Sequence, residues 1–358
     1  MSNDPKPDFT LQCPVPLADH ATVQMAHGGG GRLMRELIEG LFRPAFQPEV
    51  TPAEELAPAH DSAVVEAGAS RVAFTTDTFV VSPLFFPGGD IGRLAVHGTV
   101  NDLAMSGAKP LALSASFLLE EGFPMETLRR VVESMRQAAR EVGVPIVTGD
   151  TKVVDRGKAD GIFINTAGIG LVPERVNISP ARVEPGDAIL VTGDLGRHGI
   201  AIMSVREGLQ FEGALESDCA SLAGLVETLI EADPDIHCLR DLTRGGLAAA
   251  LNEIAQGAGV GIELDEEVIP VAPPVAGACE LLGLDPLYVA NEGRMVLIVP
   301  AEAAEATLSL LGEHPAAPEP AIIGAVVEEH PGLVELQNAL GAGRILDLLS
   351  GEQMPRIC

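Results

Sequence analysis

Strand-like and helix-like segments alternate along most of this sequence, and the alternation constrains the fold more than any other feature. RVAFTTD, PIVTGD and GIFINTAGIGLV are typical of strands, and GRLAVHGTVNDLAMSG is typical of a helix. ETLRRVVESMRQAAREVGV predicts an amphipathic helix, and its shared apolar face consists of Leu128, Val131, Met135, Ala138 and Val142. Alternation of this kind predicts an α/β fold.

A turn-rich bridge, VPERVNISPARVEPGD, separates this first series from a second one. The second series begins with the strand AILVTG and continues with helices near 221–232 and 244–256, then the strands RMVLIVP and AIIGAVVE. Because 358 residues usually divide between two domains, we expect two. The predicted boundaries are an N-terminal arm with a glycine-rich loop at 1–50, an N-terminal domain at 51–175, a C-terminal domain at 176–349 and a tail at 350–358.

Charge and composition exclude several classes of partner. A formal net charge of -28 repels nucleic acid and anionic lipid, and 11 Phe, one Tyr and no Trp leave few platforms for stacking bases. MSNDPKPDF lacks the basic and apolar regions of a signal peptide, and no apolar run is long enough to span a membrane. We therefore expect a cytoplasmic protein whose partners are small molecules or proteins. The five cysteines lack CxxC spacing and are expected to be reduced thiols.

Four acidic motifs lie at the ends of predicted strands or loops: HDSAVV, TTDTF, NDLAMSG and TGDTKVV. Their aspartates are Asp61, Asp77, Asp102 and Asp150. Any one of them alone is best explained as a helix cap or a turn residue. Together they favour a crevice in which Mg²⁺ bridges carboxylate and phosphate oxygens.

The run AHGGGGRLM places Gly28, Gly29, Gly30 and Gly31 before a basic residue and a predicted helix. Backbone amides in such a run can approach phosphate without obstruction by side chains. The run lacks the lysine and hydroxyl of a P-loop and does not follow a strand, so taken alone it reads as a flexible arm. A second glycine-rich stretch, TGDLGRHG, is equally explained as a tight connection from strand to helix.

Two further motifs, RDLTRGGLAAAL at 240–251 and NEGRM at 291–295, place charges beside small residues. Ion pairs within each motif are the simplest explanation. Glu292 precedes a glycine at the start of a strand, where a carboxylate in a crevice of low dielectric could accept a proton. His97 and His198 lack an HExxH-like partner and are interpreted as structural.

The sequence ends in MPRIC, so the thiol of Cys358 lies beside a terminal carboxylate. Pro355 disfavours a continuing helix, and we expect an extended tail that moves between an outward and an inward position. The carboxylate discourages thiolate formation and Arg356 partly offsets this effect, so the chemistry alone leaves a reactive and an ordinary thiol equally open.

The motifs GGGGR, HDSAVV, TTDTF, NDLAMSGAKP, VTGDTKVV, RDLTRGG, NEGRM and PRIC, in this order, resemble the HypE family of hydrogenase maturation proteins. That family belongs to a superfamily of ATP-using enzymes with aminoimidazole ribonucleotide synthetase, selenophosphate synthetase and thiamine monophosphate kinase. The resemblance implies a two-domain aminoimidazole ribonucleotide synthetase-like fold of α+β type. It also implies a homodimer formed through the N-terminal sheets, with ATP and Mg²⁺ near the interface.

The resemblance further implies a reaction and its partners. A HypF-type carbamoyltransferase would load a carbamoyl group onto Cys358, and this chain would dehydrate it to a thiocyanate. The product would supply cyanide to the iron of nickel-iron hydrogenase, through an iron-carrying complex of HypC–HypD type.

The same resemblance implies roles for individual residues. ATP would be bound by Gly28, Gly29, Gly30, Gly31, Asp77, Thr78, Asn101, Asp102 and Asp150, and Mg²⁺ by Asp61, Asp77, Asp102 and Asp150. Lys152 would stabilise the oxygen that is phosphorylated, and Glu292 would take the amide proton.

Two other interpretations remain open at this point. A sister enzyme could phosphorylate a small molecule with ATP, which would make Cys358 incidental. Selenophosphate synthetase is the less attractive sister, because Cys13 lies upstream of the glycine run in a proline-rich context. A non-catalytic scaffold or metal carrier could use Cys358 as a ligand without turning over ATP, but the acidic motifs count against it.

Overall fold

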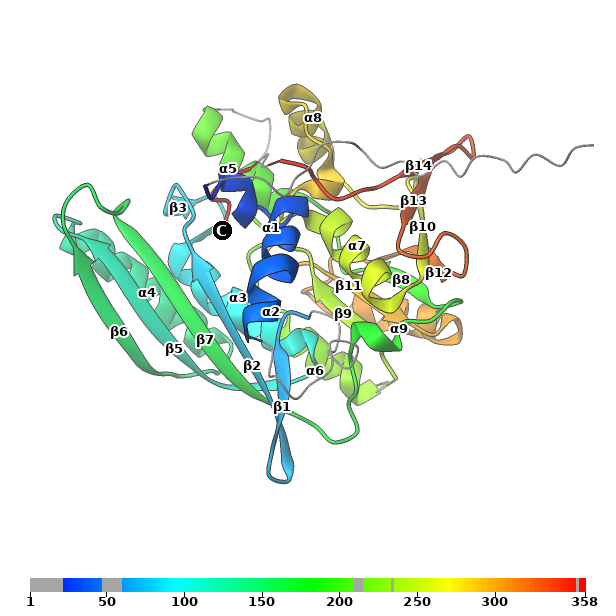
Figure 1. Ribbon diagram of the computed structural model, residues 1–358, viewed down its shortest axis with the longest axis horizontal. Helices are drawn as coiled ribbons and strands as arrows, with labels where there is room; N and C mark the ends of the chain where they lie inside the picture. Colours follow the sequence, from blue (N-terminus) through cyan, green and yellow to red (C-terminus); the bar gives the residue numbers. More distant parts are fainter. Residues whose placement is uncertain (1–21, 47–59, 209–214, 233–234, 352–353) are drawn as a thin grey trace, which may run out of the picture.

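The computed structural model describes residues 22–46, 60–208, 215–232, 235–351 and 354–358. One large sheet lies in the N-terminal half of the chain and another in the C-terminal half, with helix α3 between them (Figure 1). The predicted α/β class is therefore confirmed, and both sheets mix parallel and antiparallel pairs.

The N-terminal sheet has five strands in the order β1-β2-β7-β5-β6. They are β1 (Ala63–Ala67), β2 (Ser70–Phe79), β5 (Lys109–Glu120), β6 (Ile146–Val154) and β7 (Ile162–Val172). Only β5 and β6 pair in parallel within this sheet. Strand β6 forms one edge, as the left side of Figure 1 shows.

Helices α3 (Ile91–Met105) and α4 (Met125–Glu141) cover one face of this sheet. The side chain of Asp90 accepts hydrogen bonds from two backbone amides at the start of α3, which fixes where that helix begins. The amphipathic pattern predicted for α4 is confirmed, because three residues of its apolar face are buried: Val131, Met135 and Ala138.

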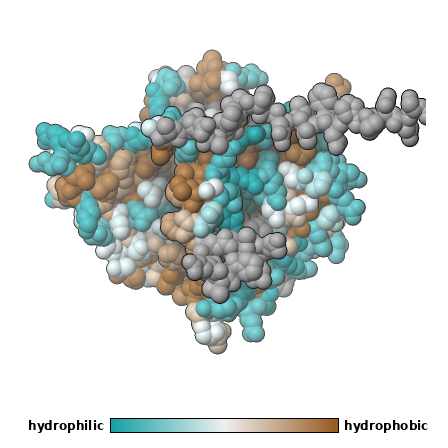
Figure 2. All heavy atoms as spheres, in the orientation of Figure 1, coloured by the Kyte–Doolittle hydropathy of each residue, from teal (hydrophilic) through white to brown (hydrophobic). Residues whose placement is uncertain are grey.

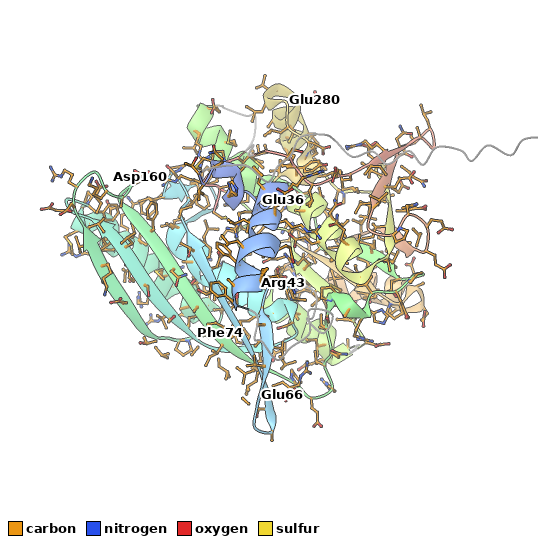
Figure 3. All side chains as sticks on the ribbon, in the orientation of Figure 1. Glu36, Arg43, Glu66, Phe74, Asp160 and Glu280 are labelled. Atoms are coloured by element: carbon orange, nitrogen blue, oxygen red, sulfur yellow. The ribbon has the colours of Figure 1, made fainter. Side chains whose placement is uncertain are left out.

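The opposite face of the N-terminal sheet, called the outer face below, exposes apolar side chains. Side chains alternate between the two faces of a strand, so every second residue of β2 and β7 points outward. Phe74 on β2 is 47% exposed, and its cross-strand partner Ile169 on β7 is 42% exposed (Figure 3). Apolar side chains gather over this part of the molecule in Figure 2.

The C-terminal sheet has seven strands in the order β14-β13-β10-β12-β8-β11-β9. They are β8 (Ala188–Val191), β9 (Cys238–Asp241), β10 (Gly261–Asp265), β11 (Met295–Val299), β12 (Ala321–Val327), β13 (Val334–Gln337) and β14 (Gly343–Ile345). Strands β8 and β11 are buried along their whole length, as expected for the centre of a covered sheet.

The helices of the C-terminal half are α5 (Arg197–Glu207), α6 (Ala223–Ala232), α7 (Gly246–Ala258), α8 (Pro273–Leu282) and α9 (Ala304–Glu313). The short turn η4 (Pro180–Arg182) precedes β8, whereas η5 (Pro286–Tyr288) and η6 (Ala301–Ala303) lie on either side of β11. In the N-terminal half, β3 (Phe85–Phe86) pairs with β4 (Gly89–Asp90). The stretch TGDLGRHG connects β8 to α5, which is one of the two interpretations given above. In the part of the chain that is described, no helix is both long and apolar enough to cross a membrane.

The arm before the first sheet is helical and contacts the C-terminal half. It consists of η1 (Met25–Gly28), α1 (Arg32–Leu37), η2 (Ile38–Phe42) and α2 (Arg43–Phe46), drawn in dark blue in Figure 1. The amide of Arg32 donates to the carbonyl of Leu349 over 2.8 Å, and its side chain pairs with Asp347 over 2.6 Å. The arm therefore lies beside the segment that leads into the tail.

Residues of the tail belong to the core that the two halves share. One hydrophobic cluster contains Val96 of α3, Ile200 of α5 and three tail residues: Met354, Ile357 and Cys358. Cys358 is thus buried between the two halves of the molecule. The domain boundaries predicted above remain predictions.

Candidate active site

Three carboxylates converge where α3 meets β9. Carboxylate oxygens of Asp61, Asp102 and Asp241 all lie within 4.8 Å of one another. Burial raises the pKa of Asp61 and of Asp102 well above the usual range, and repulsion from Asp241 adds to both. Burial likewise raises the pKa of Asp241 to about 6. We call these three residues the acidic cluster.

Few positive charges neutralise the acidic cluster. Arg240 Nε lies 2.8 Å from Asp61 Oδ1, and the hydroxyl of Thr75 donates to Asp102 Oδ2 over 2.8 Å. Asp61 Oδ2 and Asp241 Oδ2 are buried and have no hydrogen-bond partner among the described residues. Buried oxygens that lack a donor fit a hard divalent cation, which binds oxygen ligands.

Asp77 links the acidic cluster to a second group of residues. It lies on β2, on the face opposite to Phe74, and its carboxylate accepts a hydrogen bond from the amide of Thr78 over 2.7 Å. Its negative charge helps to raise the pKa of Asp102, Asp241 and Glu292. The charge of Asp77 therefore acts on all three residues.

Glu292 is buried in the bend that precedes β11 and is held through its backbone. Asp218 Oδ2 accepts hydrogen bonds from the amides of Glu292 and Gly293, over 3.1 and 3.0 Å. Glu292 Oε1 is buried without a hydrogen-bond partner in the described part of the chain. Burial is the largest cause that raises the pKa of Glu292, and repulsion from Asp241 follows.

The tail brings Cys358 to the same place. Cys358 is 6% exposed, and Arg244 Nη1 lies 3.4 Å from its sulfur. Burial raises the pKa of the Cys358 thiol to about 12, against the opposing effect of Arg244, and Glu292 and Asp77 raise it further. Cys358, Arg244, Glu292 and Asp77 therefore form one group, in which the sulfur is a neutral thiol.

The glycine run covers this group from the side of the arm. Gly28 and Gly29 line a cavity of about 60 Å³ together with Cys358 and Arg244. Gly30 has φ +73°, and a Cβ there would lie 2.8 Å from the carbonyl oxygen of Arg244. The run thus contacts the site instead of forming a separate arm, while its contact with phosphate remains a prediction.

Asn101 is buried and its side chain bonds the protein backbone. Its Nδ2 donates to the carbonyl of Ala220 over 3.0 Å, and its Oδ1 accepts from the amide of Leu222 over 2.7 Å. Asn101 therefore joins α3 to the loop that contains Asp218. The predicted contact between Asn101 and ATP would be made in addition to these bonds.

The structure places Asp150 and Lys152 apart from this site. Across the sheet, Asp150 of β6 lies opposite Ser116 of β5, Ser116 opposite Asn165 of β7, and Asn165 opposite Thr78 of β2. Residues that lie opposite each other on neighbouring strands point to the same face of the sheet. Asp150 and Thr78 therefore both point to the outer face. Lys152 Nζ lies 2.7 Å from Asp150 Oδ2, and both side chains are exposed. This hydrogen bond, followed by one from the amide of Thr151, lowers the pKa of Asp150.

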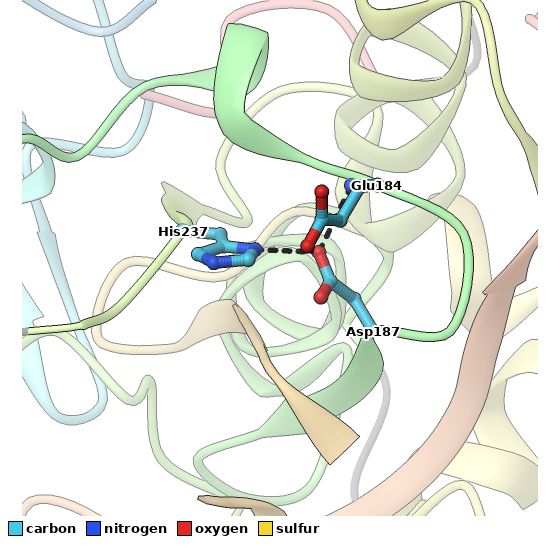
Figure 4. A group of neighbouring side chains, drawn as sticks. All are labelled: Glu184, Asp187 and His237. Carbon is cyan, nitrogen blue, oxygen red and sulfur yellow. Dashed lines mark hydrogen bonds and ion pairs between the residues drawn. The ribbon is translucent and has the colours of Figure 1, made fainter. Parts of the chain in front are cut away.

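Another group of possible metal ligands is satisfied internally. Asp187 Oδ2 accepts hydrogen bonds from the amide of Glu184 and from Nδ1 of His237, over 3.0 and 2.8 Å (Figure 4). These bonds secure the turn before β8 to the start of β9, which gives the three residues a structural role.

Both halves of the chain match known families. Residues 59–172 match the N-terminal domain and residues 184–336 the C-terminal domain of AIR synthase related proteins. The carbamoyl dehydratase HypE of Azotobacter vinelandii is 54% identical over 339 residues, which cover 95% of this chain and 98% of that protein. The chain belongs to the HypE family. The resemblance and the two-domain fold predicted from the sequence are thus confirmed.

Solved structures of HypE have the same fold. HypE in complex with ATP aligns with a TM-score of 0.79 at 48% identity, covering 94% of this chain and 100% of that one. HypE in a HypE–HypF complex aligns with a TM-score of 0.81 at 48% identity, covering 87% and 99%.

Sequence reasoning missed four residues of the site. It treated Asp241 and Arg244 of RDLTRGG as an ion pair, whereas Asp241 joins the acidic cluster and Arg244 contacts Cys358. Arg240, from the same motif, pairs with Asp61 and Glu253. The charged motif was a usable signal for these residues. Asp218 lies in ESDCAS, which offers no comparable signal.

Proposed function

We propose that this chain uses ATP to dehydrate a carbamoyl group carried on Cys358 and supplies cyanide for the iron of nickel-iron hydrogenase. The observation that carries the proposal is the position of the Cys358 sulfur, which lies 3.4 Å from Arg244 and within the electrostatic influence of Glu292 and Asp77. A relative with 54% identity is a carbamoyl dehydratase, and a HypE with 48% identity forms a complex with ATP.

The reaction removes one oxygen and two protons from a thiocarboxamide. The carbonyl oxygen attacks the γ-phosphorus of ATP and ADP leaves, which turns a poor leaving group into phosphate. The C–O bond then breaks and the nitrogen loses its protons, leaving a C≡N bond on sulfur. The sum is R–S–C(O)NH₂ + ATP → R–S–CN + ADP + phosphate, with one proton on the phosphate and one released.

The described residues can perform these steps. Glu292 takes a proton from the nitrogen, and its raised pKa makes its ionised form a stronger base than an exposed glutamate. Arg244 holds the sulfur and lies where it can donate to the adjacent carbamoyl oxygen. Glycines 28–31 would bring backbone amides to the phosphates.

The acidic cluster and Asp77 suit Mg²⁺, because two buried carboxylate oxygens of the cluster lack a donor among the described residues. Mg²⁺ bound there would neutralise charge on the transferred phosphoryl group. Asp61, Asp102, Asp241 and Asp77 would each offer one oxygen, and Asp241 is added to the residues predicted from the sequence.

We further propose that Asp150 and Lys152 act in a homodimer. The apolar outer face supports pairing of two N-terminal sheets, and Asp150 and Lys152 point to this face. In such a dimer Asp150 would join the ATP site of the partner subunit and Lys152 would stabilise the oxygen that is phosphorylated there.

The proposed partners follow from the chemistry on Cys358. A HypF-type carbamoyltransferase would load the sulfur, in line with the complex that a HypE of 48% identity forms with HypF. An iron-carrying complex of HypC–HypD type would accept the cyanide. We place the reaction in the cytoplasm, where these maturation steps would meet.

Mass spectrometry of the C-terminal peptide tests the proposal. With HypF, carbamoyl phosphate and ATP, the wild-type peptide should gain a carbamoyl group and then lose one water. Cys358→Ala should show neither change, and Cys279→Ala, which removes another buried thiol, should behave as the wild type. Modification of an internal peptide, or ATP turnover on a small molecule without any change in the tail, would show that the proposal is wrong.

A further inference from the structure

The tail is held in its inward position mainly through its backbone. The amide of Val80 donates to an oxygen of the terminal carboxylate of Cys358 over 2.9 Å, and the amide of Ser82 donates to the carbonyl of Arg356 over 3.3 Å. The segment that follows β2 therefore pairs with the tail much as an added strand would. These bonds set the register that places the Cys358 sulfur at Arg244.

A guanidinium on α5 reinforces this pairing. Arg206 Nε donates to the carbonyl of Ser82 over 2.6 Å, and Nη1 donates to the carbonyl of Pro355 over 2.6 Å. Arg206 Nη2 donates to the carbonyl of Arg356. One planar side chain thus binds both the tail and the segment against which the tail lies, as the fixed fork of arginine donors allows.

His198, earlier on the same helix, binds the next carbonyl. Its Nε2 lies 2.7 Å from the carbonyl oxygen of Ile357, and its Nδ1 lies 2.8 Å from Ser217 Oγ. Burial is the largest cause that lowers the pKa of His198, so the ring is neutral and carries one proton. A carbonyl can only accept, so that proton is on Nε2 and the Ser217 hydroxyl donates to Nδ1.

We propose that Arg206 and His198 are positioning residues, which form a clamp on three successive tail carbonyls and set the balance between the inward and the outward tail. The inference rests on the proposed function and adds the control of tail position to it. Every clamp contact reaches the backbone, at Pro355, Arg356 and Ile357, so a group attached to the Cys358 sulfur does not disturb it.

A clamp of this kind has opposite effects on the two half-reactions. Loading by a carbamoyltransferase needs the sulfur outside, whereas dehydration needs it beside Glu292 and Arg244. The side chain of Arg356 adds further contacts to the inward position. Its Nε donates to the carbonyl of Val80 over 2.9 Å, and its guanidinium pairs with Asp160 of the loop between β6 and β7. Weakening the clamp should favour loading relative to dehydration.

Alkylation of Cys358 measures the balance without any partner or nucleotide. The sulfur is 6% exposed when the tail is inward, so iodoacetamide reacts only with the outward fraction. Arg206→Ala removes hydrogen bonds from a charged donor and should raise the alkylation rate of Cys358 by about tenfold to a hundredfold. Arg206→Lys keeps one cationic donor and should give an intermediate rate.

Arg129→Ala serves as the matched control, because Arg129 is an exposed arginine on α4 whose partner is Glu126. Its alkylation rate should equal that of the wild type. In the full system with HypF, carbamoyl phosphate and ATP, the ratio of loading rate to dehydration rate should rise in Arg206→Ala and stay constant in Arg129→Ala.

If Arg206→Ala binds Mg-ATP as the wild type does and its Cys358 is alkylated at the wild-type rate, Arg206 does not hold the tail inward and the clamp proposal is wrong. The same holds if Arg206→Lys reacts as fast as Arg206→Ala, since a cationic donor would then contribute nothing. If the wild type forms no thiocyanate, the proposed function fails, yet alkylation still measures the clamp.

Discussion

The acidic cluster and the Asp150–Lys152 pair contain the same chemical groups in opposite surroundings. In the cluster, burial and mutual repulsion raise the pKa of Asp61 and Asp102, and oxygens of Asp61 and Asp241 lack a donor among the described residues. On β6, Asp150 is exposed, and a hydrogen bond from Lys152 lowers its pKa. The negative charge of the cluster is compensated only when a proton or a cation binds, whereas Asp150 and Lys152 already compensate each other's charge.

We interpret this difference as a division of roles, in which the acidic cluster binds a ligand and the Asp150–Lys152 pair acts in subunit assembly. Buried carboxylates cost stability until a ligand compensates their charge, which is typical of a functional site. An exposed ion pair contributes little to folding, so a function for Asp150 and Lys152 requires another surface to approach them. The proposed dimer provides that surface.

The largest effect is expected inside the buried site. Glu292→Gln keeps the shape of the side chain but cannot accept a proton, so dehydration should slow by about a hundredfold or more while loading continues. Single-turnover mass spectrometry of the carbamoylated peptide measures the rate. Glu280→Gln, on the exposed surface of α8, is the control and should react normally (Figure 3). A normal dehydration rate in Glu292→Gln would show that Glu292 is not the base.

Mixed dimers test the proposed position of Asp150 directly. Glu292→Gln and Asp150→Asn should each be inactive alone. If Asp150 completes the site of the partner subunit, one site of each mixed dimer is intact, and a 1:1 mixture should recover about a quarter of the wild-type activity. Purified mixed dimers without activity would show that Asp150 does not act across the interface.

Removing one carboxylate of the cluster should have opposite effects on ligand binding and on the free protein. Asp102→Asn should weaken Mg-ATP binding by about tenfold to a hundredfold in calorimetric titration, because one hard ligand is lost. Without Mg²⁺ the same variant should unfold at a higher temperature, because a buried like charge is gone. An unchanged affinity for Mg-ATP would show that Asp102 is not a metal ligand.

The raised pKa values predict how stability depends on pH. The folded state holds protons on Asp241 up to about pH 6, compared with an ordinary value of 3.8 in the unfolded chain. This contribution is complete below the unfolded value and is lost as the pH rises through about 6. In EDTA the Tm should fall by about 2 °C between about pH 5 and pH 7.5.

Mg²⁺ should reduce that fall, because a bound cation replaces the protons. Asp241→Asn should reduce it as well, even without Mg²⁺. Thermal unfolding at both pH values provides the measurement, and a Tm that rises with pH in EDTA would contradict the prediction.

The smallest effect is expected on the outer face. Asp150→Asn should change the Tm of the monomeric protein by less than about 1 °C, since exposed ion pairs contribute little to folding. Asp102→Asn, measured beside it without Mg²⁺, provides the contrast. A large loss of stability at Asp150 would mean that the pair supports the fold.

Local patterns predicted the regular elements well. The apolar face of α4 and the strands β2, β6 and β7 could be identified because each has a clear period within its own segment. Strand β5 was missed, because KPLALSASFLLE follows a turn-like stretch and contains Pro110 near its start.

The site was harder to predict than the elements, since its residues meet only through the packing of both halves. Asp102 on α3 and Asp241 on β9 are far apart in sequence, and nothing near RDLTRGG indicates which carboxylates it will face. The inward tail likewise depends on Arg206, whose sequence surroundings carry no recognised signal, and on His198, which the sequence analysis interpreted only as structural.

The position of Cys358 beside Arg244 also has a kinetic consequence. A reacting group that belongs to the enzyme's own chain has a local concentration set by the tether, independent of how much protein is present. Conversion of the loaded sulfur should therefore be first order and unaffected by dilution as long as the proposed dimer persists. Dilution should slow only the encounters with the donor of the carbamoyl group and with the acceptor of the cyanide.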